Sequence, residues 1–126
     1  MMLCIATAGT VAALVASSFT LSWTHSVEHT QWRESWVVQG DRLQVVEASV
    51  EGSGAGIAVP PDAVWADGRW SYRPALGPVP SLNLAASGMT PSPWTLCPPD
   101  GQCLTLGAGA GEAVRLWAGA DCDQSQ

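Results

Sequence analysis

The chain has 126 residues, of which 13% are charged, with five Arg, no Lys and a formal net charge of −6. This length predicts one domain, residues 1–126, with a modest core. The charge argues against a nucleic-acid ligand, because no basic stripe is present to neutralise phosphates, and it disfavours binding to anionic lipid.

The first 16 residues are apolar, carry no basic residue and are too short to cross a bilayer, so we expect no direct membrane span. Gly9-Thr10 in their middle predicts a first β-hairpin, roughly Leu3–Thr7 and Val11–Ala16. An atypical secretion signal within residues 1–17 stays open as the alternative. Because no convincing signal peptide is present, periplasm and cytoplasm both stay open as the compartment.

Alternation with a period of two predicts three antiparallel strands between Phe19 and Glu51. On each strand one ionisable residue takes a place on the apolar face: His25, then Glu34, then Glu47. Ionisable groups on an apolar face are costly unless they are paired. A row of three such residues therefore predicts a functional site or a structural polar cluster.

The expected register brings this row together. Gly40-Asp41 is suited to a two-residue hairpin turn, since glycine supplies the positive φ that such turns need. The turn sets three cross-strand pairs, which are Val38 with Leu43, Trp36 with Val45, and Glu34 with Glu47. In the preceding pair of strands, matching Trp23 with Trp36 places His25 beside Glu34. Two carboxylates at this spacing repel each other unless a proton, a cation or the imidazole lies between them.

Gly and Pro divide the rest of the chain into short apolar runs that predict further strands, at residues 69–73, 82–86, 94–97, 102–106 and 113–118. No helical pattern with clear caps is present. The expected fold is therefore all-β, a small antiparallel sandwich or partly closed barrel of about nine or ten short strands. Trp70 is expected to point inward, and most of the seven Trp residues are expected in the core.

A glycine-rich stretch, residues 52–56, follows the third strand and is neither a P-loop nor a dinucleotide-binding motif. A turn or bulge is the favoured interpretation. The alternative is close backbone approach to a ligand beside Glu47, which makes Gly54 and Gly56 candidate binding residues.

The four cysteines allow two disulfides. Cys97 and Cys103 flank a turn-rich stretch that brings two thiols close, and Cys4 pairs with Cys122 if the first and last strands are neighbours. Buried free cysteines are the alternative. No spacing typical of cysteine-bound zinc occurs.

The motif His25-Ser26-Val27, followed by Glu34, Glu47 and the Gly-Ala-Gly of residues 54–56, resembles a bacterial and archaeal family known as domain of unknown function 1850. Residues 94–103 look like its proteobacterial members, and the resemblance covers nearly the whole chain. Genes of such proteins lie beside those of TRAP transporters of the TAXI type. The resemblance therefore implies an accessory role in solute uptake, with TRAP transporter components as partners.

Three functions stay open. The first is a binding module for a small polar ligand or a divalent cation. Its expected ligand-binding residues are His25, Ser26, Glu34, Glu47, Gly54 and Gly56, of which His25, Glu34 and Glu47 are the expected metal ligands. The second is a partner-binding module with surface tryptophans, in which the polar row serves only the fold. The third is an enzyme with a Glu–His acid/base pair, placed last because no nucleophile or oxyanion donor set is recognisable.

Overall fold

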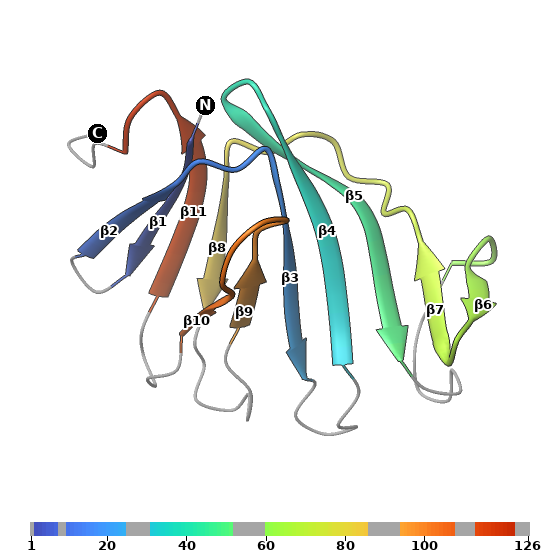
Figure 1. Ribbon diagram of the computed structural model, residues 1–126. Helices are drawn as coiled ribbons and strands as arrows, with labels where there is room; N and C mark the ends of the chain where they lie inside the picture. The colour runs from blue at the N-terminus through green and yellow to red at the C-terminus, as the bar shows by residue number, and fades with distance from the viewer. Residues whose placement is uncertain are drawn as a thin grey trace.

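The computed structural model describes residues 2–7, 10–24, 31–51, 60–85, 94–107 and 113–122. These residues form eleven strands, all paired antiparallel, in two sheets that do not close into a barrel (Figure 1). The all-β prediction is confirmed, in its sandwich form. No helix that could span a membrane occurs in the described part of the chain.

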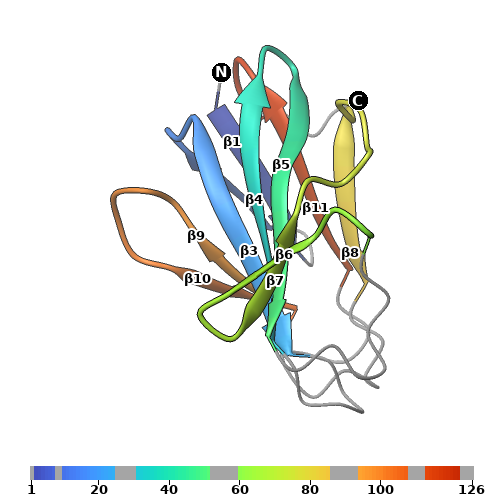
Figure 2. The ribbon, with the colours of Figure 1, turned by 90° about the vertical axis from the view of Figure 1, so that its right-hand side faces the viewer.

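The smaller sheet has four strands in the order β2 (Thr10–Leu14), β1 (Met2–Thr7), β11 (Ala113–Gly119) and β8 (Ser81–Ala85). The larger sheet has seven strands in the order β10 (Leu104–Leu106), β9 (Trp94–Cys97), β3 (Ser18–Thr24), β4 (Gln31–Gln39), β5 (Arg42–Glu51), β7 (Arg69–Tyr72) and β6 (Val64–Ala66). The view in Figure 2 shows β8 and β11 in a second layer beside β5, and both strands contact β5.

Strand β6 was not expected from the apolar pattern, because it has only three residues and all of them are exposed. It pairs with β7 through a tight turn at Asp67-Gly68, where both residues have positive φ, 53° and 77°. An Asp-Gly pair with positive φ at both positions is the favoured two-residue hairpin turn. This dipeptide was the local signal for the additional strand.

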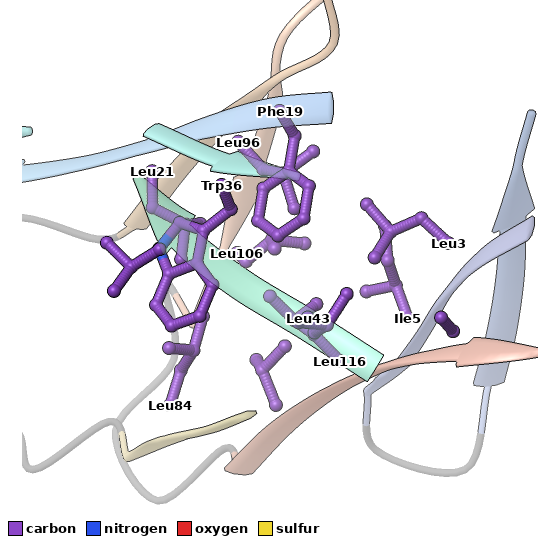
Figure 3. Packing of buried hydrophobic residues seen from close by; sticks show 13 residues of the cluster. Leu3, Ile5, Phe19, Leu21, Trp36, Leu43, Leu84, Leu96, Leu106 and Leu116 are labelled. Carbon is purple, nitrogen blue, oxygen red and sulfur yellow. The ribbon is translucent and has the colours of Figure 1, made fainter. Parts of the chain in front are cut away.

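The core lies between the two sheets and is built from alternate residues of each strand. Figure 3 shows how side chains of both sheets meet there. The larger sheet contributes Phe19, Leu21, Trp36, Leu43, Val45, Leu96 and Leu106, and the smaller sheet contributes Leu3, Ile5, Leu84, Val114, Leu116 and Ala118. We call the face of each sheet that carries these residues the inner face.

Both expected disulfides are present, Cys4–Cys122 and Cys97–Cys103. The first forms because β1 and β11 are neighbours in the smaller sheet, with Cys4 opposite Trp117. The second closes the short turn-rich segment between β9 and β10.

Candidate functional site

Five of the seven tryptophans lie together across the inner face of the larger sheet, at one end of its strands. In Figure 1 these ends of β9, β3, β4, β5 and β7 lie at the bottom of the sheet. We call this set the tryptophan row, which consists of Trp94, Trp23, Trp32, Trp70 and Trp65.

The rings of the row are in contact in two groups. Trp23 stacks on Trp32 with ring centroids 6.4 Å apart, and it meets Trp94 at 4.8 Å. Trp65 and Trp70 are cross-strand partners at 5.2 Å. The buried Val50 separates the two groups, because it opposes Trp32 on one side and Trp70 on the other. Aromatic cross-strand pairs of this kind stabilise a sheet.

Glu34 lies on the same inner face, one step further along the strands. Directly opposed residues of neighbouring strands share a face. The chain of opposed residues through Glu34 is Leu104, Leu96, Leu21, Glu34, Ala48 and Tyr72. Leu21, Leu96 and Ala48 are buried, so Glu34 takes the inward position that strand alternation predicts.

The carboxylate of Glu34 is half-buried and, among the described residues, accepts a hydrogen bond 3.1 Å long from Nε1 of Trp36. Burial raises the pKa of Glu34, and the Trp36 hydrogen bond opposes that rise in part. The pKa of Tyr72 is also raised, mainly by burial and further by the negative charge of Glu34. The two groups therefore sense each other across the small side chain of Ala48.

Two indole N–H groups on the inner face have no hydrogen-bond partner among the residues that the structure describes. They are Nε1 of Trp32 and Nε1 of Trp70, and both atoms are buried. Trp32 is two residues before Glu34 on the same face, and Trp70 stands in the same relation to Tyr72. Buried donors without an acceptor are rare and call for an explanation, such as a ligand or an ordered water.

Glu47 does not join Glu34, and the expected register at this point is wrong. The pairs Val38–Leu43 and Trp36–Val45 form as expected, but a β-bulge follows, so that Ser35 opposes Glu47 and Glu34 opposes Ala48. The extra residue, Val46, shifts the phase of β5 by one and turns Glu47 to the exposed outer face. A bulge of this kind places two residues of one strand opposite one of its partner.

The expected register between the first two strands of this sheet is also wrong. Trp23 opposes Trp32 rather than Trp36, and the partner of Glu34 is Leu21. The observed register stacks Phe19 on Trp36 and Trp23 on Trp32. It therefore forms two aromatic cross-strand pairs between β3 and β4. His25, Ser26, Gly54 and Gly56 lie outside the described residues, so their expected roles stay predictions.

The described residues contain no group of three or more His, Cys, Asp or Glu side chains placed to hold a metal ion. Glu34 and Glu47 point to opposite faces of the sheet, so these two carboxylates do not form a shared cation site. If either carboxylate binds a ligand, it does so without the other.

A second polar cluster lies on the outer face and is satisfied within itself. Arg69 donates to Oγ of Ser49 at 3.1 Å, and to Oε1 and the backbone O of Gln31 at 3.2 Å each. Its guanidinium is 4.0 Å from the carboxylate of Glu51, which in turn accepts the Gln31 backbone N–H at 2.8 Å. These groups connect the ends of β4, β5 and β7. Because Arg69 is engaged there, it does not neutralise Glu34, which has no cationic partner among the described side chains.

Strand alternation alone did not identify Trp32, Trp70 and Tyr72 as neighbours of Glu34. It assigned Trp32 to the same face and Trp70 to an inward position, both as observed. It did not align the strands, because alternation specifies a face and leaves the register open. The signal for the bulge was present, since the apolar positions move from odd numbers, Leu43 and Val45, to even numbers, Ala48 and Val50.

The fold and this site define a small two-sheet β-sandwich with a carboxylate–aromatic site on one inner face. The chain belongs to the family described as domain of unknown function (DUF1850), whose model matches residues 19–106. This range contains Glu34, Tyr72 and the whole tryptophan row. Comparison with curated proteins and with solved structures gave no match in either case.

Proposed function

We propose that this protein is a small binding module that holds a polar or cationic solute at the inner-face site centred on Glu34. One observation carries the proposal: a half-buried inner-face carboxylate has a single hydrogen-bond donor among the described residues, and two buried indole N–H groups on the same face have no acceptor among them. Structural polar clusters are normally satisfied, as the Arg69 cluster is. A cluster that lacks partners is better suited to an exchangeable ligand.

The proposal includes an accessory role in solute uptake beside TRAP transporter components of the TAXI type. This partner rests on the family resemblance of the sequence motifs and on membership of the DUF1850 family. The two disulfides support a location in an oxidising compartment, where transported solutes are first captured.

The test is a binding screen on the purified full chain with two matched variants. Native mass spectrometry would detect a co-purifying small molecule, and thermal shift would survey amino acids, sugars, carboxylates, amines and divalent cations. We expect at least one compound to raise the melting temperature of the wild type and of Glu47→Gln, and to lose this effect in Glu34→Gln. If no compound from any class binds and none co-purifies, the proposed function is wrong.

A second candidate function, contact with a protein partner, is favoured by exposed apolar side chains at the β6 edge. Val64 is 62% exposed and Trp65 is 47% exposed. Tryptophan is enriched in binding hot spots. Replacing Val64 by Ser, on the face of β6 opposite the tryptophan row, would weaken such a contact without changing solute binding at Glu34, so a pull-down with the wild type and this variant separates the two functions.

A further inference from the structure

The charge balance of the inner face limits what the ligand can be. The chain has no Lys, and all five Arg residues are described. Arg69 is engaged on the outer face. The remaining four, Arg33, Arg42, Arg73 and Arg115, are exposed, and none of them forms an ion pair with Glu34. Glu34 therefore has no cationic partner among the described side chains, and a cation bound beside it would stabilise its charged form.

The surroundings of Glu34 are poor in the atoms that metal ions require. Ca²⁺ takes six to eight oxygen ligands, and zinc takes several nitrogen, sulfur or oxygen ligands at close range. Glu34 is flanked instead by Leu21, Ala48 and aromatic rings, and no metal-ligand cluster occurs in the described ranges. A carboxylate in such surroundings favours a large, weakly hydrated cation over a hard inorganic ion.

Aromatic rings next to a carboxylate are the known means of holding organic ammonium ions. The negative π-face of Trp attracts a cation within about 6 Å, and several rings together form a cage. On the inner face, Trp32 and Trp36 lie two residues before and after Glu34, and Tyr72 lies beyond Ala48. Glu34 therefore has rings on both sides along its strand and on one side across the sheet.

The unsatisfied donors add a second requirement. Nε1 of Trp32 and Nε1 of Trp70 have no acceptor among the residues described above, and an indole N–H donates but cannot accept. A ligand that carried only a cationic group would offer neither donor an acceptor, and an unpaired buried donor is costly. An oxygen on the same ligand would satisfy at least one of them.

We propose, on the basis of the function proposed above, that the ligand is an organic ammonium ion that also carries an oxygen acceptor. Its cationic head contacts Glu34 and the faces of the half-buried Trp32 and Tyr72, while Trp36, buried in the core, holds the carboxylate through its indole N–H. Its oxygen accepts from the indole N–H of Trp32 or Trp70. Choline is a suitable probe for this class, because it combines a quaternary ammonium with one hydroxyl.

The experiment is calorimetric titration of the purified full chain at constant ionic strength with three probes. Choline has both features, tetramethylammonium lacks the oxygen, and the uncharged isostere 3,3-dimethylbutan-1-ol lacks the charge. We expect choline to bind about tenfold tighter than the uncharged isostere, a difference of about 1.4 kcal/mol, because its positive charge is attracted to the carboxylate of Glu34 and to the aromatic faces. Tetramethylammonium should bind with an intermediate affinity.

Two variants assign the effect to the site. Glu34→Gln keeps an acceptor for Trp36 and removes the charge, so choline should lose about tenfold in affinity while the uncharged isostere is unchanged. Glu47→Gln, on the outer face, should bind choline like the wild type.

The outcomes separate this inference from the proposed function. Equal affinity for choline and the uncharged isostere, or tighter binding of a divalent cation, would overturn the ammonium assignment. Tetramethylammonium binding as tightly as choline would overturn the acceptor role of the oxygen. If a neutral or anionic solute from the screen binds in a Glu34-dependent way and choline does not, the binding function stands and only the ligand class is wrong.

Discussion

Ionisation of Glu34 carries a cost that depends on pH. Burial raises its pKa in the folded state, so between the unfolded pKa of about 4.3 and the higher folded pKa the folded chain holds more protons. The free energy of unfolding therefore falls as pH rises through this window, and the loss is complete above the folded pKa. The other titratable group facing Glu34 among the described residues is Tyr72, whose pKa is raised and which stays neutral in this window.

We predict that Glu34→Gln stabilises the protein at neutral pH, by an amount on the order of 1 kcal/mol, because it removes this cost and retains an acceptor for Trp36. Urea denaturation from acidic to neutral pH would measure it. The free energy of unfolding of Glu34→Gln should not fall with rising pH as that of the wild type does. Glu47→Gln, on the exposed face, should show the same fall as the wild type. A less stable Glu34→Gln at neutral pH would contradict this account of the site.

Residue by residue, the sequence predicted which face each side chain takes better than it predicted the neighbours of that side chain. The inward positions of Glu34 and Trp70 followed from alternation with a period of two. The expected partner of Glu34 did not follow, because one extra residue in β5 reverses the faces beyond it. The aromatic surroundings of Glu34 depend on the same register and were missed for the same reason.

Among the elements, β5 depends most on a local irregularity. The bulge keeps Leu43 and Val45 inward before it and Ala48 and Val50 inward after it. Bulges often lie next to functional sites, where they redirect a side chain. Here the bulge turns Glu47 away, so that no second carboxylate of the described strands joins Glu34.

We predict that β5 tolerates deletion of Val46 and not deletion of Ser49. Removing Val46 makes the pairing regular and should cost about 1 kcal/mol or less. Removing Ser49 either turns Glu47 inward beside Glu34 or turns Val50 outward, and should cost more than about 4 kcal/mol. Thermal unfolding of the two deletion variants would compare them, and equal stability would show that the bulge does not set the register.

At the scale of the whole molecule, the frequency of Gly and Pro and the short apolar runs were enough to predict a β-sandwich. They were not enough to predict the strand order, because the pairing of β1 with β11 joins the two ends of the chain and no local pattern encodes it. The cysteines were the one sequence signal for this contact, since Cys4 and Cys122 can pair only if those strands are neighbours.

We predict that the two disulfides contribute unequally to stability. Cys4–Cys122 spans 118 positions of sequence and Cys97–Cys103 spans 6. On the chain-entropy model, closing these loops is worth about 5 and about 2 kcal/mol respectively. Urea denaturation of Cys4→Ala/Cys122→Ala and of Cys97→Ala/Cys103→Ala would measure the difference. A larger loss from the second double variant would contradict it.

The Cys4–Cys122 bond also has a mechanical consequence. It joins the first described strand to the segment just after the last one, so the chain from Cys4 to Cys122 forms a covalent ring. Tension applied before Cys4 and after Cys122 would pass from one sulfur to the other, and the strands inside this ring would not be stretched until that bond was reduced.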